Sequence, residues 1–242
     1  MISASSRSFQ NSRKAQWGIP FEAWARLDIR LAFCKFQIMI PVETFTADLS
    51  AIPEADFTHQ HVLDFLRQNR VEVKSLAPYL YFCSEHYTRN LIQRTPLYDL
   101  LAICWEIGQQ SPIHNHCNQS CWMAMACGRV QVHNFELIRK DPATGFCELK
   151  PDNHYIIDGG NPAEVDPGEP IHLVANARSL GSRAVTLHIY SKPYDTCEVY
   201  DLKGKRYQEV RLSNTTEYGV VKSDWKLEKA DWRSLAPGGD TA

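Results

Sequence analysis

The sequence predicts an antiparallel β-barrel or β-sandwich that follows a helical region. Before about residue 95, two stretches carry apolar residues at helical spacing. From about residue 97, the chain consists of short apolar runs that clusters of Gly, Pro, Asn and Asp separate. Many short strands without intervening helices are typical of a closed or two-layered antiparallel sheet.

Length, composition and charge fit one globular domain with short extensions. The chain has 242 residues, of which 44% are hydrophobic and 22% are charged, so it can bury one sizeable core. Its net charge of −2 provides no excess of positive charge that would attract nucleic acid or an anionic membrane. We therefore expect no nucleic-acid partner and a small-molecule ligand instead.

The cysteines and the apolar segments indicate a cytoplasmic protein. The eight cysteines show neither CxxC pairs nor zinc-ribbon spacing, and reduced thiols are the default for such a set. The apolar stretch at 31–40 is too short to cross a bilayer, and Lys35 and Gln37 interrupt it. We expect no membrane association and a monomer.

The expected helices precede the strands. Apolar spacing predicts helices at 20–33 and 58–69, with Thr58 as the cap of the second, and a partly helical segment at 74–92. The first residues are rich in Ser and Arg, and we interpret them as a disordered extension rather than a transit peptide.

His114 and His116, in "SPIHNHCNQSC" (111–121), are candidates for a metal site. In a strand, side chains two residues apart point to one face, so the two imidazoles would form a chelating pair. His59 and His61 have the same spacing in a helical pattern, where it corresponds to about 200° of rotation, so we interpret them as surface histidines. By spacing alone, the segment could also be a redox pair of thiols or a polar turn.

The surroundings of this pair resemble the cupin superfamily. The first cupin motif, with spacing G-x5-H-x-H-x4-C-x6-G, is matched by Gly108, His114, His116, Cys121 and Gly128. The segment "PGEPIHLVAN" (167–176) resembles the second motif and contains His172, with a slightly longer spacing than the commonest form. This resemblance implies an all-β core of the cupin type, a small β-barrel also described as a double-stranded β-helix or jelly roll.

Cys121 stands where many cupins carry a glutamate ligand, and this substitution narrows the family. Together with "YTRN" (87–90), "CW" (104–105) and "LHIYSKPYDTC" (187–197), it makes the chain similar to thiol dioxygenases, and specifically to the cysteine dioxygenase family. The resemblance implies an enzyme that uses Fe(II) and O2 to oxidise the thiol of L-cysteine to cysteine sulfinic acid.

The resemblance implies that His114, His116 and His172 hold the iron. Three neutral imidazoles leave more positive charge on a metal than the usual two histidines and a carboxylate, which favours an anionic ligand such as a thiolate. His188 is the rival third ligand. We rank it below His172 because the second cupin motif surrounds the latter.

Arg89, Tyr87 and Cys197 are expected at the substrate. A guanidinium matches a carboxylate bidentately, and the family's carboxylate-binding arginine falls at position 89. By itself, Arg89 could equally be a surface salt-bridge residue. Tyr87 would support it if the segment is extended, and Cys197 matches a family cysteine near the substrate entrance.

Thr186, His188 and Tyr190 form the polar face of the strand "VTLHIY" (185–190). The pattern alone is typical of a half-exposed strand. The resemblance instead places this face inside the barrel, where Thr186 would bond His188 and His188 would orient the Tyr190 phenol towards the iron. The family also joins Cys121 to Tyr190 by a thioether, and both partners are present here. Trp105 is expected in the core.

Three other functions remain open. A dioxygenase for mercaptopropionate or another small thiol is less favoured because related enzymes commonly lack Cys121 and Arg89. A non-catalytic cupin that holds zinc or nickel fits three histidines but has no need for the polar face of 185–190. A redox switch of Cys117 and Cys121 would not require a metal.

We divide the chain into three parts. Residues 1–40 form an N-terminal extension that is partly disordered or helical. The thiol dioxygenase domain is expected over 41–205, with helices at 41–95 and the barrel at 96–205. Residues 206–242 are a C-terminal extension that packs on the barrel or trails from it, with a helical turn or two near its end.

Overall fold

The computed structural model describes residues 38–159, 162–165, 171–222 and 224–235. The expected helix at 20–33 and most of the N-terminal extension therefore lie outside the described residues. Within the described ranges, no helix is long and apolar enough to span a membrane.

Short helices and a parallel strand pair begin the described chain. The Thr58 hydroxyl accepts a hydrogen bond from the His61 amide and caps the second helix, as the sequence predicts. In chain order these elements are β1 (Ile38–Ile40), α1 (Val42–Ser50), the 3-10 helix η2 (Glu54–Asp56), α2 (His59–Gln68), β2 (Asn69–Val71), the 3-10 helix η3 (Val73–Tyr79) and β3 (Tyr81–Phe82).

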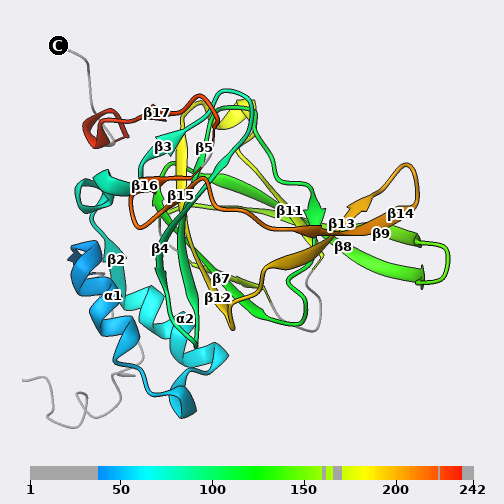
Figure 1. The fold of residues 1–242 in the computed structure, drawn as a ribbon, viewed down its shortest axis with the longest axis horizontal. Helices are drawn as coiled ribbons and strands as arrows, with labels where there is room; N and C mark the ends of the chain where they lie inside the picture. The colour runs from blue at the N-terminus through cyan, green and yellow to red at the C-terminus, as the bar shows by residue number, and fades with distance from the viewer. Residues whose placement is uncertain (1–37, 160–161, 166–170, 223, 236–242) are drawn as a thin grey trace, which may run out of the picture. The chain divides into compact units, whose positions relative to one another are not determined.

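The larger sheet separates the helices from the barrel interior (Figure 1). Its inner strands are antiparallel, and β15 joins β4 in parallel. In spatial order the described strands of this sheet are β10 (Ala163–Val165), β7 (Ser120–Cys127), β12 (Ala184–Ser191), β5 (Asp99–Trp105), β4 (Thr88–Arg94), β15 (Thr216–Glu217) and β16 (Val220–Val221).

The second sheet closes on itself. Its strands, in spatial order around the ring, are β11 (His172–Ala175), β6 (Ile113–His114), β13 (Thr196–Asp201), β14 (Arg206–Arg211), β9 (Phe146–Ile157) and β8 (Val130–Asp141). The remaining described elements are the 3-10 helix η4 (Arg178–Leu180), β17 (Glu228–Lys229), which pairs with β3, and the 3-10 helix η5 (Trp232–Leu235). The expected cupin-type barrel with a preceding helical region is confirmed.

The two faces of the larger sheet bury different residues. On β5, Leu100, Ala102 and Cys104 pack with the helices, whereas Leu101 and Ile103 point to the barrel interior. The strand β12 is buried on both faces from Ala184 to Tyr190. A solvent-facing polar side, which the alternation alone favoured, is therefore wrong for this strand, because the second sheet covers it.

Two expected boundaries need correction. The helices do not continue to residue 95, because 88–94 form β4, and its alternating side chains face the two sides of the sheet. The barrel does not end at residue 205, because 206–211 form β14. The Asp201 carboxylate accepts bonds from the amides of Lys203 and Gly204, and this turn returns the chain along β13.

Candidate active site

His114, His116 and His172 converge inside the barrel. His114 ends β6, and His172 begins β11 as its Cα partner across the sheet. His116 follows β6 instead of lying in it, so the expected strand covers only part of the HxH segment. The candidate ligand atoms of the three side chains nevertheless lie within 4.8 Å of one another, close enough to contact one ion.

Burial keeps these three imidazoles neutral. It lowers the pKa of His114 to about 4, and it lowers the pKa of His116 and His172 well below the usual range, with a smaller effect from the neighbouring rings. Neutral imidazole is the form that binds a metal.

The unpaired nitrogens fit a metal ion. Both ring nitrogens of His116 and Nδ1 of His172 are buried without a hydrogen-bond partner in the described part of the chain. Such atoms are costly unless a ligand satisfies them. In His114, Nδ1 lies 3.0 Å from the Pro112 carbonyl oxygen, which accepts a hydrogen bond from the Nδ1 proton and leaves Nε2 as the ligand atom.

Asn115 ties the segment between the two histidines to β13. Its backbone amide donates to the Glu198 carbonyl at 3.1 Å, and its side-chain oxygen accepts from the Glu198 amide at 3.0 Å. Its Nδ2 donates to the Glu198 carboxylate at 2.9 Å and to the Tyr200 hydroxyl at 3.2 Å. Four hydrogen bonds therefore fix the backbone between His114 and His116.

Thr186, His188 and Tyr190 form a buried chain of hydrogen bonds. His188 Nε2 lies 2.9 Å from the Thr186 hydroxyl, and His188 Nδ1 lies 3.1 Å from the Tyr190 hydroxyl. Both ring nitrogens of His188 are thus engaged, which disfavours it as the third metal ligand. Trp105 extends the chain, because its Nε1 donates to the Thr186 hydroxyl at 2.9 Å.

The sequence pattern predicts only a core position for Trp105, and it predicts no role for Tyr194. The Tyr194 ring lies 5.4 Å from that of Tyr190 and 6.5 Å from that of His116, between ring centroids. A signal was present for both residues. Tyr194 lies within the "YSKPYDTC" part of the family motif, and the "CW" motif contains Trp105.

Arg89 and His114, one of the three clustered histidines, line the same cavity. Arg89, Tyr87, His114 and Cys197 line a cavity of about 270 Å³. The Arg89 guanidinium lies 5.6 Å from the centre of the Tyr190 ring, and its Nε is buried without a partner among the described residues. A guanidinium stays charged, so this cavity favours an anionic ligand.

Cys121 and Tyr190 face each other from neighbouring strands. They are Cα partners in the antiparallel pair of β7 and β12, and only 0% and 3% of their surfaces are exposed. Directly opposed residues in such a pair have Cβ atoms about 4.5–5.5 Å apart. Burial raises the pKa of both groups, so Cys121 is a thiol and Tyr190 is a phenol at neutral pH.

Comparisons with known proteins point to one family. A family model described as cysteine dioxygenase type I matches residues 40–203. Cysteine dioxygenase type 1 of Homo sapiens is 29% identical over 145 residues, which cover 60% of this chain and 70% of the human protein. The protein of the same name from Rattus norvegicus is 28% identical over 184 residues, covering 76% of this chain and 86% of the rat protein.

Two solved structures also align with part of the chain. A sugar phosphate isomerase from a cupin superfamily, from Silicibacter pomeroyi, aligns with a TM-score of 0.36 and 12% identity, covering 58% of this chain and 82% of that chain. A protein with a double-stranded β-helix domain from Klebsiella pneumoniae aligns with a TM-score of 0.34 and 14% identity, covering 45% and 74%.

Asn115→Asp is expected to weaken metal binding about 10- to 100-fold, although it hardly changes the side-chain volume. The new carboxylate would face the Glu198 carboxylate, which now accepts the Asn115 amide at 2.9 Å, and like charges repel at a partly buried site. Titration of the metal-free protein with Co(II) against a coloured chelator measures the affinity.

The matched control combines Asn115→Asp with Glu198→Gln, which restores a donor opposite an acceptor. We expect this double variant to recover most of the affinity. Wild-type affinity in the single variant would show that the bonds between Asn115 and Glu198 do not position the histidines.

Proposed function

Because the chain belongs to the cysteine dioxygenase type I family, we propose that it oxidises the thiol of L-cysteine with O2 to cysteine sulfinic acid, using Fe(II). The carrying observation is the cavity that the charged Arg89 guanidinium lines together with His114, one of three neutral histidines whose ligand atoms lie within 4.8 Å of one another. These two features match the carboxylate and the thiol of one small molecule.

His114, His116 and His172 would hold the metal. When bound, Fe(II) would supply positions at which the substrate thiolate and O2 meet, and the electron density that activates O2. Both oxygen atoms would go to the substrate sulfur, so the reaction of one thiol with one O2 needs no further reductant.

Arg89 binds and orients the substrate carboxylate. No acidic side chain pairs with it in the described part of the chain, so the interpretation as a surface salt-bridge residue has no support there. Tyr87 stacks on Trp105 with ring centroids 4.7 Å apart and forms a fixed wall beside the guanidinium. The substrate carboxylate would thereby satisfy the buried Nε of Arg89.

Tyr190 presents a protonated hydroxyl beside Arg89 and His116. Burial raises the pKa of Tyr190, so the phenol keeps its proton at neutral pH. The hydrogen bond to His188 Nδ1 fixes the position of that hydroxyl. The Thr186 hydroxyl bonds Nε2 on the other side of the His188 ring and so fixes the imidazole. With the imidazole proton of His188 on Nδ1, His188 donates to the Tyr190 oxygen, so the phenol proton is free to be donated where negative charge develops during oxidation of the thiol. The thioether to Cys121 would fix the phenol further.

A thiol redox switch is less well supported. Burial raises the pKa of both Cys117 and Cys121, and the thiolate is the reactive form in disulfide exchange. The Cys117 thiol also donates to the Thr196 carbonyl at 3.2 Å.

Fe(II)-loaded protein that is given L-cysteine should consume O2 and release a product with two added oxygen atoms, measured with an oxygen electrode and mass spectrometry. Metal-free protein is the control and should be inactive. Oxidation of mercaptopropionate alone would retain the iron site but reject L-cysteine as substrate, and turnover of neither thiol with iron bound would favour a non-catalytic cupin.

Arg89→Ala should raise the KM for L-cysteine by about ten- to a hundred-fold, the range for a lost hydrogen bond to a charged group. Cysteamine, which lacks the carboxylate, should be affected little, because it makes no contact that the variant removes. Bound iron should stay at the wild-type level. Loss of iron together with activity would instead assign Arg89 to the structure of the metal site.

His172→Ala should abolish stable iron binding, whereas His188→Ala should keep it. The reason is that both ring nitrogens of His188 already form hydrogen bonds, while Nδ1 of His172 has no partner among the described residues. Elemental analysis after anaerobic loading measures occupancy. Full occupancy in His172→Ala would move the third ligand to another residue.

A further inference from the structure

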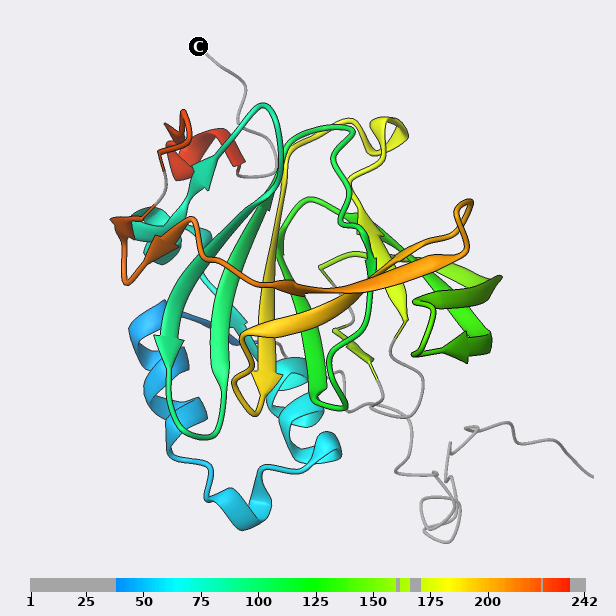
Figure 2. The same ribbon diagram turned by 45° about the vertical axis from the view of Figure 1, so that its right-hand side comes forward.

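The outer wall of the substrate cavity comes from the chain beyond the family match, which ends at residue 203. We define residues 212–229, of which 223 is not described, as the C-terminal strap. Its residues Leu212, Ser213, Thr215 and Trp225 line the same cavity as Arg89. Figure 2 shows the orange chain crossing from β14 to β15, beside β4.

Within the strap, Thr215 satisfies both outward-facing backbone groups of Arg89. The Arg89 amide donates to the Thr215 hydroxyl at 3.1 Å, and the Arg89 carbonyl accepts from the Thr215 amide at 2.7 Å. On the other edge of β4, Arg89 pairs with Ile103 of β5. The backbone that carries the guanidinium is therefore held from both sides.

Thr216 makes a similar hydrogen bond to β4 that does not involve Arg89. Its hydroxyl donates to the Asn90 side-chain oxygen at 3.0 Å. Thr215 and Thr216 are equally buried, at 1% and 0% exposure. These two neighbouring threonines thus contribute similar buried hydroxyls to β4, but only one of them contacts the arginine.

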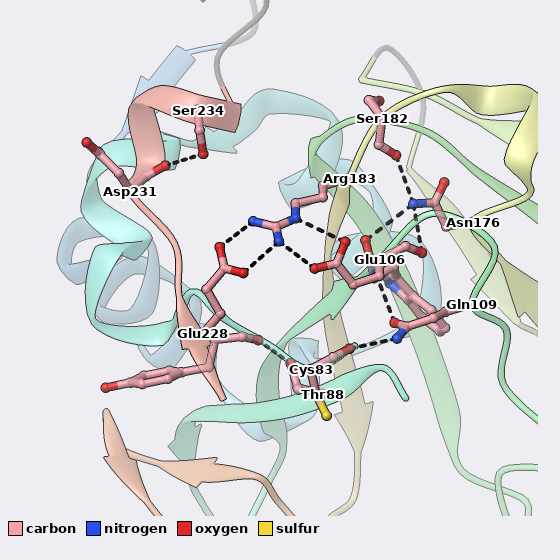
Figure 3. Close-up of polar contacts among 12 residues, drawn as sticks. Cys83, Thr88, Glu106, Gln109, Asn176, Ser182, Arg183, Glu228, Asp231 and Ser234 are labelled. Atoms are coloured by element: carbon pink, nitrogen blue, oxygen red, sulfur yellow. Dashed lines mark hydrogen bonds and ion pairs between the residues drawn. The ribbon is translucent and has the colours of Figure 1, made fainter. Parts of the chain in front are cut away.

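The far end of the strap is anchored as well. Arg183 donates two parallel bonds to the Glu228 carboxylate, at 2.9 and 3.0 Å, and also pairs with Glu106 (Figure 3). Between the two anchors, the Trp225 ring lies against that of His86, with centroids 3.8 Å apart. The cavity wall is therefore fixed at both ends.

We propose that Thr215 is a positioning residue that holds Arg89 at the depth where its guanidinium meets the carboxylate of a thiol acid. This inference rests on the proposed function, because it assumes that Arg89 binds the substrate. Recognition geometry tolerates errors of only about 0.5 Å, and a long arginine side chain amplifies any shift of its backbone. The hydroxyl of Thr215 thus acts on substrate choice through Arg89, without contacting iron.

Thr215→Val tests this role, because valine keeps the branched shape but cannot accept a hydrogen bond from the Arg89 amide. The KM for L-cysteine should rise between about two- and tenfold, the range for one neutral hydrogen bond. The kcat for L-cysteine, the bound iron and the kcat/KM for cysteamine should stay close to wild type. The preference for L-cysteine over cysteamine should therefore fall by the same factor.

Two variants control for folding. Thr215→Ser keeps the hydroxyl and should restore the wild-type preference. Thr216→Val removes the hydroxyl that bonds the Asn90 side chain. It should therefore lower the Tm about as much as Thr215→Val but leave the preference for L-cysteine over cysteamine unchanged. An equal loss for both thiols in Thr215→Val, or an unchanged preference, would overturn the proposal.

The failure of the proposed function would be visible in the wild-type protein, as the absence of turnover with L-cysteine. In that case anaerobic calorimetry with the Fe(II)-loaded proteins decides about Thr215. Weaker L-cysteine binding by Thr215→Val than by Thr216→Val would support the positioning role, and equal binding would contradict it.

Discussion

The fold and the site both depend on the register in which β12 pairs with β7 and β5. In this register, Val185, Leu187 and Ile189 pack against the helices. The intervening side chains, including His188 and Tyr190, are turned into the barrel. A slip of one residue would exchange the two sets, which would bury an imidazole and a phenol among the helices and remove both from the barrel interior. Burial of the apolar face therefore fixes the position of the chemical groups.

The charged groups of the candidate site carry charge of one sign only. Arg89 carries a permanent charge, and the three histidines are kept neutral by burial, so no negative group among them balances the guanidinium or a bound cation. A thiol acid brings two anionic groups when its thiol is deprotonated. Such a ligand would neutralise both positive centres at once, whereas a simple thiol would leave the arginine charge buried and unpaired.

The sequence predicts the local parts of this arrangement well and the long-range parts poorly. The spacing of His114 and His116 is visible within a few residues, and the alternation of β12 is visible within one strand. By contrast, the Trp105 indole bonds Thr186 across 81 positions, and the Arg89 amide bonds Thr215 across 126. Neither pairing leaves a periodic signal. The strand β4 differs from the expected helical segment for a related reason, since its strand character comes from pairing with β5 and β15.

The two ends of the ligand are expected to contact different sheets. The metal group lies on the closed ring, where Asn115 ties it to Glu198, and Arg89 lies on the larger sheet, where Thr215 holds it. The hydrogen bonds of Asn115 and those of Thr215 act on different strands, so metal affinity and carboxylate recognition can vary separately. Under the proposed function, the spacing between the sheets would set the length of thiol acid that spans both centres. A ligand that is too short would reach only one of them, which makes packing between the sheets, and not the histidines alone, a determinant of substrate choice.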